Sequence, residues 1–130
     1  MKILVDADAL VALAKADDVN HAKALKLACK IKNDLLYLSP FTVAEAATVF
    51  SYRFSHLAAR IFLKLVRQRN FTELSLDLKS RRLADEIFLA QNTRKTSWFD
   101  CLNAALYQLN SLDAIFSFDR FYRRMGLKLL

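Results

Sequence analysis

The feature that most constrains this chain is its first apolar stretch, which runs directly into an acidic residue. Residues 3–5 (Ile-Leu-Val) are typical of a buried strand, and Asp6 follows with no intervening turn. Acidic side chains are rarely buried without a partner. The carboxyl ends of strands are also where open parallel sheets bind their ligands. We therefore expect the rest of the chain to bring further functional groups to Asp6.

Short apolar stretches alternate with helical patterns along the rest of the chain. Strands are expected at residues 3–5, 35–38, 70–76 and 114–118, with 127–130 as a candidate edge strand, and helices at 9–16, 20–32, 40–54, 55–69, 77–92, 97–110 and 120–125. This alternation favours a parallel sheet with helices on both faces. No repeat or linker interrupts it. We predict a single α/β domain over residues 1–130, with three α/β/α layers and a mostly parallel sheet of four to five strands.

Two helix starts carry capping residues. Ser39 is a good N-cap and Pro40 suits the first helical position, so we predict that a helix begins there and holds Glu45 in its second turn. Ser97 and Asp100 have the spacing of a capping box, which places Asp100 at the third position of the next helix.

Four acids fall on one edge of the predicted sheet. Asp6 and Asp119 follow strands, whereas Glu45 and Asp100 lie near the amino ends of helices that share this edge. Such carboxylates repel one another, and some would be protonated unless a cation compensated them. Mg²⁺ or Mn²⁺ prefers these oxygen ligands, and such a site can activate water for displacement at phosphorus.

Each acid also has an ordinary structural explanation. Asp100 would interact favourably with a helix dipole, Asp119 suits a turn, and Glu45 suits a solvated helix face, although its neighbours are apolar. The metal hypothesis therefore depends on the four acids as a set.

The charge of the chain favours a polyanionic partner such as nucleic acid. Its formal net charge is +7, and basic residues at Arg94-Lys95 and Arg120 flank two of the acids. A single Gly and a single Pro argue against a Gly-rich phosphate loop. The 55% hydrophobic content is consistent with a homodimer and with a groove for a partner segment. No apolar run is long enough for a membrane span and no signal peptide is evident, so we expect a cytoplasmic protein.

The segments that carry the acids resemble the motifs of PIN-domain ribonucleases, and most closely those of compact VapC-like toxins from bacterial and archaeal toxin–antitoxin pairs. The resemblance covers essentially the whole chain. The matching segments are Ile3-Leu-Val-Asp6-Ala-Asp8, Ser39-Pro-Phe-Thr-Val-Ala-Glu45, Ser97-Trp-Phe-Asp100-Cys-Leu-Asn-Ala-Ala105 and Ile115-Phe-Ser-Phe-Asp119-Arg-Phe121. The pair Asn20-His21 also resembles a common feature of the family.

This resemblance implies Mg²⁺- or Mn²⁺-dependent endonucleolytic cleavage of single-stranded RNA by a toxin that an antitoxin protein holds inactive. It assigns metal contact chiefly to Asp6 and Asp100, makes Glu45 and Asp119 the remaining acids of the catalytic pocket, and gives Ser117 a supporting role.

Two departures from the family pattern stand out. Asp8 occupies a position where the family commonly has Thr or Ser; we favour a cap of the next helix over a contribution to metal binding. Trp98-Phe99 is bulkier than usual and is expected to narrow the pocket.

Two alternatives come from other classes of protein. Asp6 and Asp8 after a strand, with Ser39 after the next strand, also resemble haloacid-dehalogenase-like phosphatases, but Leu10 replaces the usual Thr or Val and no catalytic Lys is well placed. The third hypothesis is a catalytically inert PIN-like binding module, against which the presence of all four acids argues.

Overall fold

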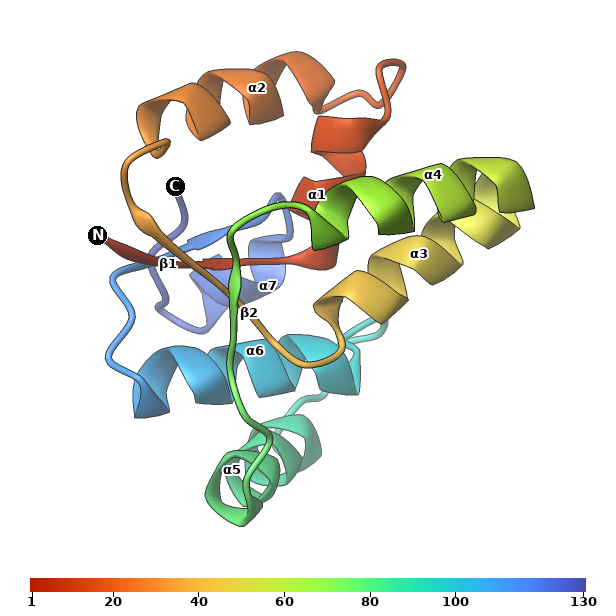
Figure 1. Ribbon diagram of the computed structural model, residues 1–130. Helices are drawn as coiled ribbons and strands as arrows, with labels where there is room; N and C mark the ends of the chain where they lie inside the picture. Colours follow the sequence, from red (N-terminus) through yellow and green to blue (C-terminus); the bar gives the residue numbers. More distant parts are fainter.

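The central strand β1 (Lys2–Val5) organises a sheet of four strands, all of them parallel. It pairs with β2 (Leu35–Leu38) on one side and with β4 (Ala114–Phe116) on the other, and β3 (Thr72–Glu73) lies beyond β2. The computed structural model describes the whole chain, residues 1–130. Figure 1 shows β1 passing through the middle of the molecule between two groups of helices.

Seven helices cover the sheet. They are α1 (Ala7–Ala14), α2 (His21–Lys30), α3 (Thr42–Arg53), α4 (His56–Arg67), α5 (Leu78–Leu89), α6 (Trp98–Leu109) and α7 (Arg120–Arg124). Figure 1 shows α1 to α4 on one side of the sheet and α5 with α6 on the opposite side. None of the helices has the length and apolar character that a membrane span requires.

Alternate residues of β1 enter two separate hydrophobic cores. Ile3 and Val5 join the core built with α1 to α4, whereas Leu4 joins the core built with α5, α6 and α7. Successive side chains of a strand point to opposite faces, so a fully apolar strand can serve two cores at once. The predicted three-layer α/β/α fold with a parallel sheet is therefore confirmed.

The start of α3 differs from the prediction. The helix begins at Thr42, after Phe41, rather than at Pro40 with Ser39 as its N-cap. The Ser39 hydroxyl instead accepts the Phe41 N–H at 3.2 Å and lies 3.0 Å from the Thr42 hydroxyl. A serine that bonds two residues ahead stabilises a turn rather than a helix. Glu45 consequently lies in the first turn of α3, not in the second.

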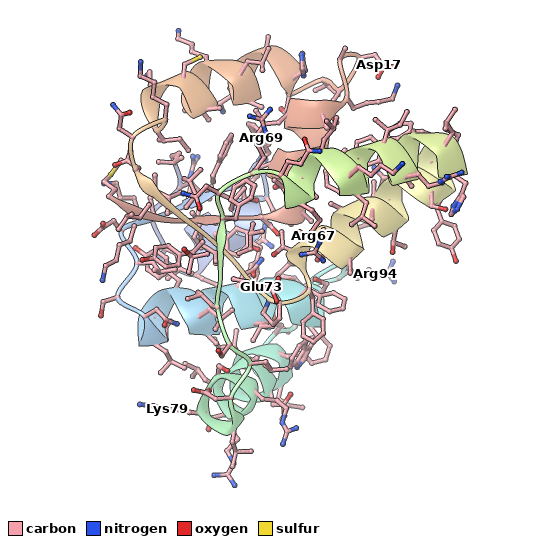
Figure 2. All side chains as sticks on the ribbon, viewed as in Figure 1. Asp17, Arg67, Arg69, Glu73, Lys79 and Arg94 are labelled. Atoms are coloured by element: carbon pink, nitrogen blue, oxygen red, sulfur yellow. The ribbon has the colours of Figure 1, made fainter.

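Three other boundaries also differ from the prediction. Helix α1 begins two residues earlier than predicted because Asp6 is its N-cap. The third strand shrinks to two residues, and the expected edge strand at the carboxyl terminus is reduced to an isolated bridge between Ile115 and Leu129. Figure 2 shows Arg67 at the end of α4 near Glu73 of β3, where their side chains form an ion pair with an N–O distance of 3.7 Å.

Candidate metal centre

Asp6 stands at the junction between the sheet and α1. Its N–H extends the β1–β4 ladder by donating to the Phe116 carbonyl at 3.1 Å, and its side chain caps α1. Only 5% of the residue is exposed. The carboxylate predicted to lie at the carboxyl end of β1 is therefore inside the protein.

The Asp6 carboxylate is surrounded by four hydrogen-bond donors. Its Oδ1 accepts the Ala7 N–H at 2.7 Å and the Asn103 Nδ2 at 3.0 Å. Its Oδ2 lies 2.8 Å from the Tyr122 hydroxyl and 3.1 Å from the Ser117 hydroxyl. Ser117, for which a supporting role is expected, thus contacts the Asp6 carboxylate directly.

Asp8 does not cap a helix, so the favoured interpretation of this residue is wrong. It lies inside the first turn of α1, and its Oδ2 accepts the Phe118 N–H at 2.8 Å and lies 3.0 Å from the Ser117 hydroxyl. Its other oxygen, Oδ1, is buried without a hydrogen-bond partner. The residue joins the acidic cluster because the first turn of α1 faces the segment that follows β4.

Asp100 is held by the predicted capping box. Its Oδ2 accepts the Ser97 N–H at 2.9 Å, while its own N–H donates to the Ser97 hydroxyl at 3.1 Å. Its free oxygen, Oδ1, lies 3.5 Å from the Tyr122 hydroxyl. One phenol therefore lies between the carboxylates of Asp6 and Asp100.

Asp119 and Glu45 complete the cluster from two other elements. Asp119 caps α7 through the Phe121 N–H at 2.7 Å, and its own N–H donates to the Ser117 hydroxyl at 3.0 Å. Glu45 is half-buried in the first turn of α3. Beside it, Phe41 packs against Trp98 and Phe99 with ring centroids 6.3 and 5.5 Å apart, which joins the starts of α3 and α6.

The electrostatics link all five acids. Burial raises the pKa of Asp6 to about 8, with further contributions from the charges of Asp8 and Asp100. Burial also raises the pKa of Glu45 to about 7, assisted by Asp100 and Asp8. The pKa of Asp8 rises to about 6 through burial and, to a smaller extent, the charge of Asp119. The pKa of Asp100 is raised by burial and by Asp119.

No basic side chain compensates this charge. The ion pairs of the structure join Met1 with Asp34, Lys15 with Asp17 and Arg67 with Glu73. Uncompensated carboxylates of this kind suit a cation. Their oxygens are hard ligands, and Asp8 Oδ1 offers a buried oxygen with no other partner.

No three of these side chains are already arranged as ligands around a single point. Mg²⁺ does not need such a preformed group, because it usually keeps several waters and takes one or two carboxylates together with substrate phosphates. The residues therefore fit a divalent cation that binds with few protein ligands.

The sequence interpretation missed two members of the site, Asn103 and Tyr122. Each lies three residues after a predicted acid, Asp100 and Asp119 respectively. Residues three apart share a helix face, so this spacing could have indicated that Asn103 and Tyr122 lie beside the acids. Asn103 stands among apolar neighbours in the sequence and Tyr122 follows Phe121, which instead suggested a role in the core.

The acidic cluster lies at the carboxyl edge of a parallel sheet, where open α/β domains bind their ligands. The PIN-domain family profile matches residues 3–128, so this chain belongs to the PIN-domain family. No curated protein matches it by sequence. The family membership leaves the phosphatase alternative without support.

Solved structures share the fold at low sequence identity. Mycobacterium tuberculosis VapC20, a toxin that cleaves the sarcin-ricin loop, has a TM-score of 0.88 at 20% identity over 98% of both chains. VapBC2 from Rickettsia felis, bound to a promoter DNA fragment, has a TM-score of 0.71 at 15% identity over 100% of this chain and 98% of that chain. FitAcB from Neisseria gonorrhoeae has a TM-score of 0.73 at 14% identity over 98% of this chain and 96% of that chain.

The capping box of α6 provides a first prediction. Ser97→Ala should destabilise the fold by about 1 kcal/mol and, by releasing Asp100, should weaken Mn²⁺ binding several-fold in calorimetry. Asp77→Ala is the matched control, because Asp77 forms the same kind of box with Ser80 at the start of α5. Equal Mn²⁺ affinity in the two variants would contradict a role for the box in placing Asp100.

The raised pKa values predict that metal-free protein loses stability as the pH rises. The folded-state pKa values of Asp8, Glu45 and Asp6 are about 6, 7 and 8, above the ordinary values of 3.8 for Asp and 4.5 for Glu. The folded state therefore binds more protons than the unfolded state, and its stability falls from about pH 4 to about pH 8.

Thermal unfolding in the presence of a chelator measures this loss. At the upper end of the range, Asp6→Asn should raise the unfolding midpoint by about 5 °C or more and should flatten the pH dependence. Asp17→Asn, in the exposed loop after α1 (Figure 2), should leave the pH dependence unchanged. A wild-type midpoint that increases towards alkaline pH would refute this explanation of the cluster.

Proposed function

We propose that this chain is a Mg²⁺- or Mn²⁺-dependent endoribonuclease that hydrolyses phosphodiester bonds in single-stranded RNA, and that it is the toxin of a toxin–antitoxin pair. The observation that carries this proposal is the cluster of uncompensated carboxylates in a chain of net charge +7. Five of the 13 acidic residues lie in the cluster, so the rest of the surface is strongly basic. Such a distribution suits a polyanionic substrate: the basic surface would attract it, and a cation in the acidic cluster would lie at the bond to be cleaved.

The proposal assigns separate tasks to the acids. Asp6 and Asp100 would hold the metal ion, and Glu45 and Asp119 would complete its acidic surroundings. A cation held there would supply an activated water and would neutralise charge on the phosphodiester. Glu45, half-buried in the first turn of α3, would be available to take the proton that the attacking water releases.

Exposed basic residues beside the cluster would bind the RNA backbone. Arg94 and Lys95 lie in the loop before α6, and Arg120 begins α7 next to Asp119. Figure 2 shows Arg94 near the amino end of α6. Contacts of this kind give affinity that depends on salt and not on sequence.

An apolar groove provides a place for the antitoxin. It has a volume of about 490 Å³ and lies between α1, α2 and α4; its lining includes Leu10, Leu13, Leu25, Phe62, Leu65 and Phe71. An amphipathic helix or strand of a partner is the usual occupant of such a groove. The related fold of VapBC2 with its promoter DNA adds support for a partner protein.

A homodimer is also part of the proposal. Large apolar side chains are exposed at the end of α3 and along α4, among them Tyr52, Phe54, Leu57 and Ile61. Exposed apolar side chains that lie close together on a surface often mark protein interfaces.

RNA cleavage tests the catalytic proposal. Purified protein should cleave single-stranded RNA in the presence of Mg²⁺ or Mn²⁺, and this cleavage should stop when EDTA is added. Asp6→Asn and Asp100→Asn should each reduce the rate by at least about a hundredfold, because each removes a carboxylate that holds the cation. Asp17→Asn, which alters an exposed acid outside the cluster, is the control.

If the wild-type protein cleaves no RNA with either metal, the nuclease proposal fails. Absence of Mg²⁺ and Mn²⁺ binding at millimolar concentration would then favour the inert binding module.

Co-expression with the product of the neighbouring reading frame tests the partner groove. Leu65→Glu places a charge among the apolar side chains that line it, and it should reduce co-purification of that product by more than about tenfold. Leu78→Glu is the control: it makes the same substitution at an exposed leucine of α5, outside the groove. If both variants retain the partner equally, the groove is not its binding site.

A further inference from the structure

The two oxygens of the Asp6 carboxylate have different kinds of donors. Oδ1 is bound by the backbone N–H of Ala7 and by the amide of Asn103. Oδ2 is approached by two hydroxyl groups, those of Ser117 and Tyr122. An ionised carboxylate has about four lone-pair sites, so these four donors together account for all of them.

The two donors to Asp6 Oδ1 have no alternative acceptor for the hydrogens that they donate to it. The Ala7 N–H is fixed by the first turn of α1. The Asn103 side chain is 1% exposed, and its Nδ2 uses its two hydrogens on Asp6 Oδ1 and on the Tyr122 hydroxyl, 3.0 Å away in each case. Asp6 Oδ1 can only accept when the carboxylate is ionised, as it would be beside a cation, and this determines the orientation of the Asn103 amide.

This orientation has a cost for Asn103. Its own carbonyl oxygen, Oδ1, is buried without a hydrogen-bond partner. An unsatisfied buried acceptor is unfavourable and uncommon, so its presence in a protein calls for an explanation. The explanation for Asn103 is that its amide nitrogen must donate to one oxygen of Asp6, which leaves its carbonyl oxygen facing away from any donor.

The donors at Oδ2, in contrast, have alternative acceptors. The Ser117 hydroxyl lies 3.0 Å from Asp8 Oδ2 as well as 3.1 Å from Asp6 Oδ2, and the Tyr122 hydroxyl lies 3.5 Å from Asp100 Oδ1. A hydroxyl has a single hydrogen, so it donates to only one of its two acceptors at a time. Oδ2 can therefore be released by rotation of a hydroxyl, whereas Oδ1 cannot.

We propose that Asn103 is a positioning residue that restricts Asp6 to metal binding through a single oxygen, Oδ2, and thereby selects Mg²⁺ over Ca²⁺. Asp8 Oδ2 receives the Ser117 hydroxyl when Asp6 Oδ2 is occupied, which gives this extra acid a role in releasing that oxygen. The inference rests on the proposed metal site and deepens it.

The selectivity follows from the size of the ions. Ca²⁺ takes six to eight oxygens and readily accepts both oxygens of one carboxylate, whereas Mg²⁺ demands octahedral geometry with fewer protein ligands. A carboxylate with one oxygen blocked is poorly suited to Ca²⁺ but still suits Mg²⁺.

Calorimetric titration of the full-length protein with Mg²⁺ and with Ca²⁺ tests the inference. The wild type should bind Mg²⁺ more tightly than Ca²⁺. Asn103→Leu, which keeps the branched shape of the side chain but removes the donor, should raise the Ca²⁺/Mg²⁺ affinity ratio about tenfold, the equivalent of one hydrogen bond to a charged group. Asn103→Ala provides the same deletion without the bulk of Leu.

Asn110→Leu is the matched control. It removes an asparagine from the carboxyl end of the same helix, where its amide contacts only the Leu106 carbonyl. A merely structural role for Asn103 would lower the affinity for both ions and leave the ratio unchanged, which would overturn the inference. A wild type that prefers Ca²⁺ would also overturn it.

The two levels of the proposal fail in different ways. If the wild type binds neither ion, the metal site itself is absent, and the proposed function and this inference fail together. If the wild type binds Mg²⁺ and the Asn103 variants keep its selectivity, only the inference fails.

Discussion

The burial of the Asp6 carboxylate is the constraint on which the rest of the structure depends. Its four donors come from four segments: the first turn of α1, the middle of α6, the residue after β4 and the interior of α7. Those segments meet only because β1 is central in a parallel sheet whose neighbours end at the same edge. The fold and the candidate site therefore depend on each other, because moving any one of these elements would remove one of the donors to a buried carboxylate.

The hydrogen bonds do not remove the repulsion between the acids. The pKa values of Asp6 and Glu45 remain raised to about 8 and 7, and no Lys or Arg forms an ion pair with the cluster. The fold keeps in its interior a charge that only a proton or a cation can neutralise. This is an expensive arrangement for a stable scaffold and a useful one for a protein that binds a metal ion and a phosphate backbone, as we propose for this member of the PIN-domain family.

Local patterns in the sequence predicted much of this arrangement. The alternation of strands and helices, the position of Asp6 after β1 and the capping box at Ser97 depend on neighbouring residues, and the structure agrees with each of them. The start of α3 was wrong because Ser39 had two local uses, a cap and a turn, and the sequence does not decide between them. Asn103 and Tyr122 were missed because their contacts with Asp6 span 97 and 116 residues. Asp8 was misassigned for the same reason, since the backbone group it binds lies 110 residues away.

Anomalous diffraction from crystals grown with Mn²⁺ tests the central claim most directly, namely that the acids around Asp6 form a divalent-cation site. The account predicts an anomalous peak within bonding distance of Asp6 Oδ2 and beside Asp100, with the Asn103 amide still bound to Asp6 Oδ1. A saturating concentration of Mn²⁺ that produces no peak at this cluster, or a peak only elsewhere on the protein, would contradict it.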